Sequence, residues 1–132
     1  MSAGDIALFS LADRRLAWLD QRQGLISQNI ANADTPGWQE RDLQPFAATL
    51  AAAGGLGGGG ELGTTRTNPL HLAAAGDPPA PSKRVKPTER APDGNSVPLE
   101  DEMVKLADTG SDHEFVTNIY KTYLLMFKTA AS

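Results

Sequence analysis

The stretch NIANADTPGW, residues 29–38, lies at the end of an apolar helical pattern and contains two asparagines, an aspartate and a Thr-Pro-Gly turn. Pro36 disfavours the α conformation at Thr35, the residue before it. A Pro-Gly pair at the two central positions of a four-residue turn is typical of a type II turn. The pattern therefore predicts that the helix stops by about Asp34.

The turn does not explain Asn29 and Asn32, because asparagine is a mediocre helix former. Two asparagines on the surface near a helix end are ordinary and need no special role. Alternatively, polar amides close to a helical seam fix register and partner choice in an assembly, at some cost in stability. The sequence leaves both interpretations open.

Upstream of this stretch, apolar residues recur at helical spacing from residue 6 to residue 33. Steps of three and four residues make a narrow seam of the coiled-coil type. At 1.5 Å per residue such a helix would be about 42 Å long, too long for a compact globule to surround. The seam residues that we expect to take part in assembly are Leu8, Leu16, Leu19, Ile26 and Ile30.

A second helical segment is predicted from residue 99 onward. Pro98 suits the start of a helix, and the three carboxylates at residues 100–102 complement the positive end of its dipole. Gly110, with a capping-box pattern just after it, allows one continuous helix weakened there or two helices with a kink; we favour the single helix. Its seam residues expected in assembly are Met103, Leu106, Ile119, Tyr123, Leu124 and Phe127.

The composition changes between these segments. Residues 54–98 hold 9 of the 13 glycines and 7 of the 9 prolines, and none of the aromatic residues lies there. Ordering a backbone costs about 1–2 kcal/mol per residue, and this segment has little apolar surface to offset that cost. We predict a flexible or disordered middle, and we build no sheet on short apolar pieces such as residues 70–72.

The predicted fold is all-α. Long amphipathic N- and C-terminal helices of coiled-coil type are joined by a flexible Gly/Pro-rich middle. The expected division places the N-terminal helix and the Thr-Pro-Gly turn in residues 1–46, the middle in 47–98 and the C-terminal helix, with Gly110 as its weak point, in 99–132.

Charge and residue types exclude several classes of function. The net charge of −4 divides into −2 over residues 1–50, +1 over 51–98 and −3 over 99–132, so no region has the basic footprint of a nucleic-acid-binding protein. The chain has no cysteine, and its two histidines, His71 and His113, form no zinc or nucleophile pattern. We therefore expect no enzyme activity, no cofactor, no metal site and no nucleic-acid partner.

Charged residues interrupt the first 20 residues every few positions, and no basic leader precedes the apolar ones. This composition is typical neither of a cleaved signal peptide nor of a membrane span. If the protein leaves the cytoplasm, we expect it to use another route.

The stretch SQNIANADTPGWQERDL, residues 27–43, resembles the N-terminal signature of the bacterial flagellar axial proteins. In that family an Asn-(Ile/Leu)-Ala-Asn segment leads into a Thr-Pro-Gly-aromatic turn, and Trp38 stands where the family usually carries tyrosine. NSVPLEDEMVKLA, residues 95–107, is similar to the second signature of the short basal-body rod proteins within this family. Residues 108–126 differ from the family's usual continuation.

The resemblance implies a structural subunit of the proximal flagellar rod in the periplasm, exported by the flagellar type III apparatus without a cleaved signal peptide. It implies polymerisation through the terminal helices, with itself and other rod and basal-body proteins as partners and no direct membrane insertion. Five residues would set the angle at which the chain leaves the helical layer: Asn29, Asn32, Thr35, Pro36 and Gly37. Trp38 is a further residue expected to take part in assembly.

Two alternatives stay open at this point. One is another short rod protein with the same N-terminal signature. The other is a soluble helical adaptor or chaperone-like module that uses its apolar seams on a foreign partner.

Overall fold

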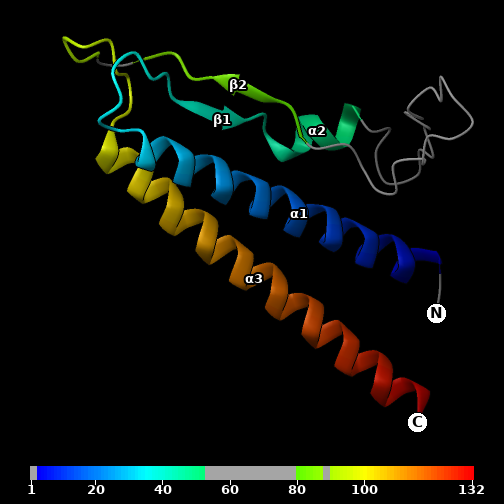
Figure 1. Ribbon diagram of the computed structural model, residues 1–132. Coiled ribbons are helices and arrows are strands. Elements are labelled where there is room, and N and C mark those ends of the chain that lie inside the picture. Colours follow the sequence, from blue (N-terminus) through cyan, green and yellow to red (C-terminus); the bar gives the residue numbers. More distant parts are fainter. Residues whose placement is uncertain (1–2, 53–79, 88–89) are drawn as a thin grey trace, which may run out of the picture.

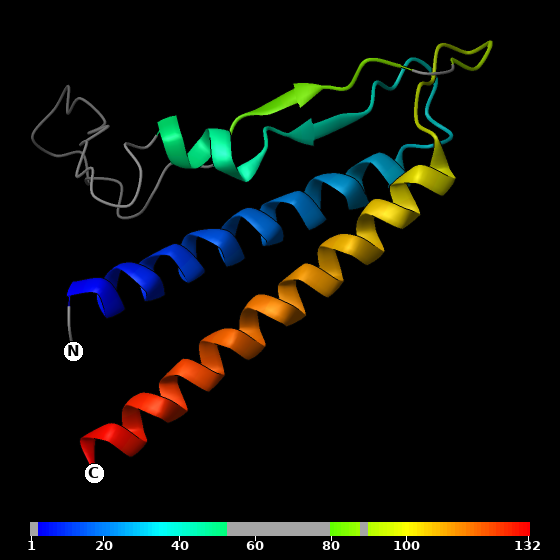
Figure 2. The same cartoon turned by 180° about the vertical axis from the view of Figure 1, so that it is seen from behind.

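The computed structural model describes residues 3–52, 80–87 and 90–132. Its elements, in chain order, are α1 (Ala3–Ala31), β1 (Arg41–Leu43), α2 (Phe46–Ala52), β2 (Ser82–Arg84) and α3 (Leu99–Ala131). The two long helices run antiparallel and meet at one end of the molecule, and the β1–β2 ribbon lies on the opposite side of α1 from α3 (Figures 1 and 2). The predicted mainly helical fold, with two long terminal helices, is confirmed.

The first long helix, α1, ends where the turn chemistry predicted. Its last residue is Ala31, and Gly37 has a φ of +75°. The Trp38 N–H donates a hydrogen bond to the Thr35 carbonyl at 3.2 Å. A positive φ at the third position of a turn closed by this bond is what a type II turn requires.

The second long helix, α3, is continuous through Gly110. It starts after Pro98 and spans 33 residues with three acidic residues in its first turn. The alternative of two helices is therefore wrong. One glycine costs a helix only about 1 kcal/mol relative to alanine, which the remaining turns of so long a helix offset.

Strand β2 lies within residues 47–98, the segment predicted to be a flexible or disordered middle. This strand pairs antiparallel with β1, with Leu43 opposite Ser82 and Arg41 opposite Arg84. Gln21 of α1 fixes the chain beside it, because its amide donates to the Ala80 carbonyl at 2.8 Å and accepts from the Ala80 N–H at 2.9 Å. These partners are distant in sequence, so no local sequence pattern predicted the strand.

Of the rest of the predicted flexible middle, the structure describes one part and leaves another outside the described residues. The short helix α2 falls almost entirely within it. Residues 53–79, which include the pieces at 70–72 and His71, lie outside the described residues.

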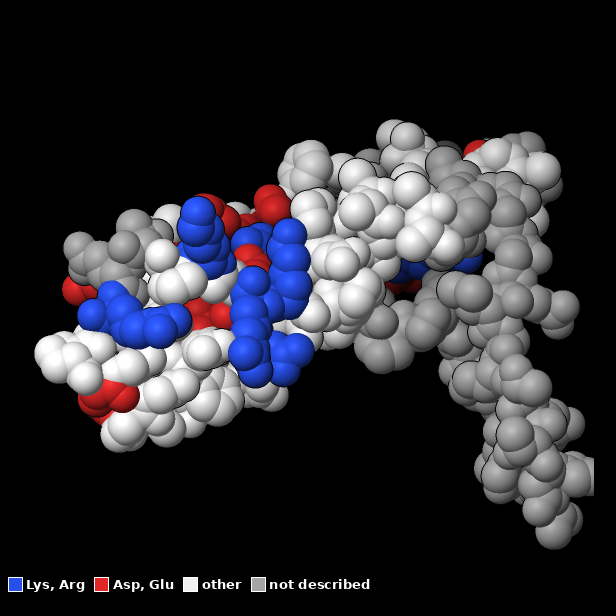
Figure 3. Space-filling view, turned by 90° about the horizontal axis from the view of Figure 1, so that it is seen from above, with Lys and Arg blue, Asp and Glu red and all other residues white. Residues whose placement is uncertain are grey.

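Basic side chains, with a few acidic ones among them, gather on the face that carries the ribbon (Figure 3).

The apolar core is small and lies midway along α1. Trp18, Leu19, Leu43 and Ala80 are buried together, and Leu25, Phe46 and Val116 pack against them. The Trp18 indole N–H donates to the Gln44 carbonyl at 3.0 Å, so even this ring has its polar atom satisfied. Since the core joins α1, α3 and the ribbon at one place, the ends of both helices extend beyond it.

Candidate functional site

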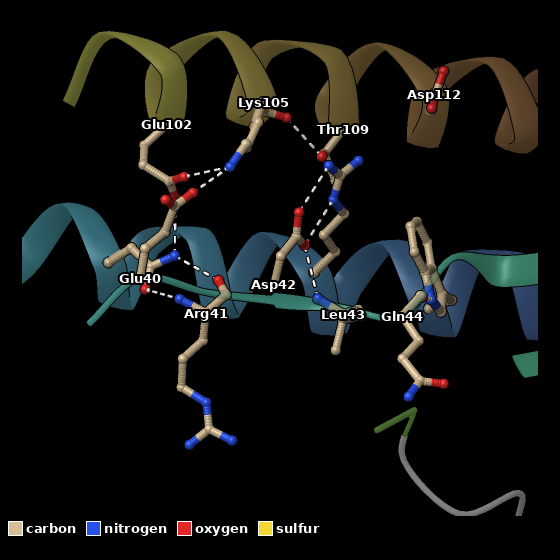
Figure 4. Close-up of polar contacts among 12 residues, drawn as sticks. Glu40, Arg41, Asp42, Leu43, Gln44, Glu102, Lys105, Thr109 and Asp112 are labelled. Atoms are coloured by element: carbon tan, nitrogen blue, oxygen red, sulfur yellow. Dashed lines mark hydrogen bonds and ion pairs between the residues drawn. The ribbon is translucent and has the colours of Figure 1, made fainter. Parts of the chain in front are cut away.

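We call the region where the end of α1, the chain leading into β1 and the start of α3 meet the junction. Its central side chains are Asn29, Glu40, Asn95, Glu102 and Lys105, all from the two segments that resemble family signatures or lie next to them. Figure 4 shows Glu40 and Glu102 facing each other, with the Lys105 amine directed at both carboxylates. The junction is thus built from polar groups, in contrast to the apolar core.

Asn29 is the hub of the junction and is only 1% exposed. Its amide nitrogen donates to the Arg41 carbonyl at 2.7 Å and to Glu102 Oε2 at 2.9 Å. Its amide oxygen accepts from the Arg41 N–H at 3.2 Å and from Trp38 Nε1 at 3.4 Å. The surface interpretation is therefore wrong for Asn29: within this chain its amide sets the register between α1, β1 and α3.

Asn32 has a more local role. Its amide nitrogen bonds back to the Gln28 carbonyl at 2.8 Å, and its oxygen accepts from the Thr35 hydroxyl at 3.1 Å. The last carbonyls of a helix lack partners within the helix. Asn95, from the second signature, donates to the carbonyls of Asn32 at 2.9 Å and Thr35 at 2.7 Å and so closes the end of α1.

The two signatures also interlock through their backbones. The Gly37 N–H donates to the Asp93 carbonyl, and the Ser96 N–H to the Trp38 carbonyl, both at 3.0 Å. Gly94 has a φ of +86°, and a Cβ placed on it would lie 3.4 Å from the Gly37 Cα. Two glycines are needed because both backbones turn with positive φ and approach closely.

The buried carboxyl pair of Glu40 and Glu102 is 3% and 0% exposed. Lys105 donates to both, at 2.8 Å to Glu102 Oε1. Burial, and a hydrogen bond with Glu102, raise the pKa of Glu40 to about 7. Burial alone would also raise the pKa of Glu102, but hydrogen bonds from its three neighbours outweigh it and lower that pKa.

Burial would lower the pKa of Lys105, but its hydrogen bonds to the two carboxylates raise it. The lysine therefore stays charged in the junction. Two carboxyls that face one ammonium in a buried site are neutralised when the pair retains one proton. The pKa of Glu40 places that proton on the pair near neutral pH.

Beyond the core, toward the termini, α1 and α3 are held by aromatic contacts. The Phe9 ring lies 5.1 Å from the Tyr120 ring, edge-on at 74°, and 5.4 Å from the Phe127 ring. His113 Nε2 lies 3.0 Å from Asp20 Oδ1 between this region and the junction. An open groove at the same end is lined chiefly by Ile6, Phe9, Ala17, Tyr120 and Leu124.

The seam residues predicted from spacing fall into two groups. In α1, Leu19 and Ile26 are fully buried, while Leu8, Leu16 and Ile30 are half-buried. In α3, Leu106 and Phe127 are half-buried, but the other four predicted residues are exposed: Met103, Ile119, Tyr123 and Leu124. The N-terminal seam thus packs inside the chain, whereas Met103 in particular, at 57% exposed, does not pack on α1.

Sequence reasoning missed the polar residues of the inner face of α3. Glu102, Thr109 and Val116 are spaced by seven residues and lie on the side toward α1, and the first two are fully buried. A search for apolar seams skips such positions because burial of polar groups depends on distant partners. The seven-residue step was the available signal.

Within residues 3–52, 80–87 and 90–132, no group of three or more His, Cys, Asp or Glu side chains is placed to hold a metal ion. None of the helices in these ranges is long and apolar enough to cross a membrane.

Comparison with known proteins places these signatures in a family. The family model described as "Flagella basal body rod protein" matches residues 11–39, which span most of α1 and the Thr-Pro-Gly turn. The flagellar basal body rod protein FlgB of Agrobacterium fabrum is 33% identical over 122 residues, covering 89% of this chain and 87% of that protein.

Two further relatives extend the match. FlgB of Proteus mirabilis is 30% identical over 133 residues, covering 91% of this chain and 93% of that protein. FlgB of Escherichia coli is 35% identical over 98 residues, covering 71% of this chain and 70% of that protein. The resemblance predicted from the two signatures is confirmed, and the chain belongs to the FlgB family of flagellar basal body rod proteins.

Proposed function

We propose that this chain is a structural subunit of the proximal rod, exported from the cytoplasm by the flagellar type III apparatus and polymerising through α1 and α3. Its partners would be further copies of itself, other rod and basal-body proteins and the export apparatus, and its role would be mechanical, with no catalysis. Family membership supports the rod assignment, and the surface of α3 supports polymerisation.

The observation that carries polymerisation is the exposed apolar surface of α3. Five side chains along this helix are 57–65% exposed: Met103, Val104, Phe115, Leu125 and Met126. Large contiguous apolar patches on a soluble protein mark interaction sites. Burial against neighbouring helices would remove this surface from water at about 25 cal/mol per Å².

The small core supports export before folding is complete. A chain that buries little apolar surface by itself is only marginally ordered, and neighbours that bind the ordered form stabilise it. Such a chain could pass a narrow channel and order fully on incorporation. Under this proposal Thr35, Pro36 and Gly37 set the path of the chain out of the helical layer through the turn described above.

The test introduces charge on the exposed face of α3. Leu125→Asp with Met126→Asp should leave the secreted amount of the chain unchanged but abolish swimming when the variant replaces the natural protein. Gln28→Asp, at an exposed polar position of α1 outside that face, is the control for an added charge and should swim normally. Normal swimming of the double variant would refute polymerisation through this face.

Export is tested separately. In a strain that lacks the flagellar export apparatus, we expect the chain to remain in the cytoplasm in full amount. Appearance of the chain outside the cytoplasm in that strain would refute the export route and leave the rod assignment untouched.

A further inference from the structure

The β1–β2 ribbon and the residues just after it are basic although the whole chain carries a net charge of −4. Between residues 80 and 87 there are three basic residues, Lys83, Arg84 and Lys86, and no acidic one, and all three are exposed. Arg41 of β1 is also exposed, and Figure 4 shows its side chain pointing away from the acidic pair of the junction. We call these four residues the basic ribbon, part of the surface in Figure 3.

Among the residues that the structure describes, no ion pair neutralises the basic ribbon. Arg41 lies directly opposite Arg84 in the strand register, and like charges in that position destabilise a strand pair. The Arg41 guanidinium donates to the uncharged Ser82 hydroxyl at 2.8 Å. In the part of the chain that the structure describes, Lys83, Arg84 and Lys86 form no ion pair. An acidic surface docked here would relieve this repulsion.

The same chain carries such a surface at the start of α3. Residues 99–114 contain six carboxylates against one lysine. Glu102 belongs to the junction and Asp112 pairs with Arg15 at 3.4 Å. The other four are exposed and form no ion pair among the described residues; we call them the acidic face: Glu100, Asp101, Asp108 and Glu114.

The arrangement of layers prevents the two surfaces from meeting within one molecule. The ribbon and α3 lie on opposite sides of α1 in both views (Figures 1 and 2). A second copy of the chain, stacked in the same orientation, would bring its acidic face to the basic ribbon of the first. Such a contact joins two different surfaces, so each copy leaves one surface of each kind free and the stack can continue.

We propose that the basic ribbon of one copy docks on the acidic face of α3 of a second copy, in a head-to-tail contact. This inference rests on the proposed self-assembly and adds which surfaces meet and by what chemistry. Charge complementarity of this kind sets orientation and makes association sensitive to salt. The opposing charges belong to one sequence, and this favours a second copy over a foreign acidic partner.

The experiment mixes two charge-reversed variants of the full chain and follows self-association by sedimentation velocity. Lys83→Glu with Arg84→Glu makes the ribbon acidic, and Asp101→Lys with Asp108→Lys makes the helix face basic. Each variant alone should associate more weakly than the natural chain by about tenfold or more, because like charges then face each other. An equimolar mixture should recover association, since each reversed surface then meets an opposite charge.

Two controls accompany the mixture. Gln23→Glu with Gln28→Glu adds two negative charges at exposed positions of α1 outside both surfaces, and this variant should associate like the natural chain. Raising the sodium chloride concentration from about 0.1 M to about 1 M should weaken self-association of the natural chain and association in the mixture alike. Circular dichroism confirms that each variant keeps the helix content of the natural chain.

The outcomes separate this inference from the proposed function. If the natural chain associates but the mixture does not recover, the head-to-tail contact is wrong and self-assembly stands. If the ribbon variant associates normally yet loses binding to phosphatidylglycerol vesicles, the basic ribbon serves an anionic lipid surface instead and the inference fails. If the natural chain does not associate at any concentration, self-assembly of the isolated chain fails together with the inference.

Discussion

At the scale of single residues, the junction depends on whether Glu40 carries a proton. Its pKa is about 7 in the folded chain against an ordinary value of 4.5. The folded chain therefore binds more protons than the unfolded chain between these two pH values, and its stability falls as pH rises through that window. The lowered pKa of Glu102 acts only below pH 4.5, where stability is lost as that group is protonated.

The first prediction concerns Glu40→Gln. The natural chain should unfold at a lower temperature at about pH 8 than at about pH 6, with a free energy of unfolding lower by about 1 kcal/mol. The glutamine is neutral at every pH, so the variant should lose most of this dependence and be the more stable at about pH 8. Thermal unfolding followed by circular dichroism measures both. Glu100→Gln, at an exposed site in the first turn of α3, is the control, and an unchanged pH dependence in Glu40→Gln would rule the explanation out.

The second prediction compares the two asparagines. Asn29→Ala removes one hydrogen bond to the buried Glu102 carboxylate and both hydrogen bonds to the Arg41 backbone, and each group that loses its partner costs about 1–3 kcal/mol. Asn32→Ala removes only exposed, local bonds and should cost about 0.5–1 kcal/mol. Urea unfolding measures both, and equal losses would show that Asn29 is not the hub of the junction.

At the scale of elements, glycines in the turns and in the helices should respond in opposite directions. Gly37→Ala forces a side chain into a positive φ and should lower stability by about 1–2 kcal/mol. Gly24→Ala lies in the middle of α1, where an added Cβ meets nothing within 4 Å. It should raise stability by about 1 kcal/mol. Differential scanning calorimetry measures both changes, and a stabilised Gly37→Ala would mean that the turn is not held in its type II form.

At the scale of the whole molecule, the apolar core is small, and the ends of both long helices extend beyond it. The described chain is held by one core cluster, one polar junction and one aromatic contact region. The division into residues 1–46, 47–98 and 99–132 stays a proposal, although residues 80–98 pack on α1 and on the Thr-Pro-Gly turn. Under the proposed assembly, partners would supply further burial and with it additional stability.

The fourth prediction follows from the proposed assembly. The helix content of the purified chain should rise with concentration as oligomers form, because association buries the exposed face of α3. Circular dichroism combined with size-exclusion light scattering over a wide concentration range measures both quantities. A monomer that melts cooperatively with the same helix content at every concentration would contradict this prediction, because the isolated chain would then fold without neighbours.

Local chemistry was enough to predict both long helices, the stop before Pro36 and the type II turn at Gly37. Each of these depends on residues close in sequence: apolar spacing, the restriction that proline places on its neighbour, and the positive φ that glycine accepts. The signature around Asn29 also predicted the family correctly, because ten adjacent positions in a fixed order are specific.

The β1–β2 pairing and the burial of Asn29, Glu40 and Glu102 were decided only in the tertiary structure. Strand β2 exists because Gln21 and Leu43, some 40 to 60 residues away, provide its contacts. The carboxyl pair is buried because an asparagine of α1 and a lysine of α3 reach it together. A polar side chain is stable in the interior only when it has hydrogen-bond partners there. Those partners are placed by the packing of distant segments rather than by neighbours in the chain.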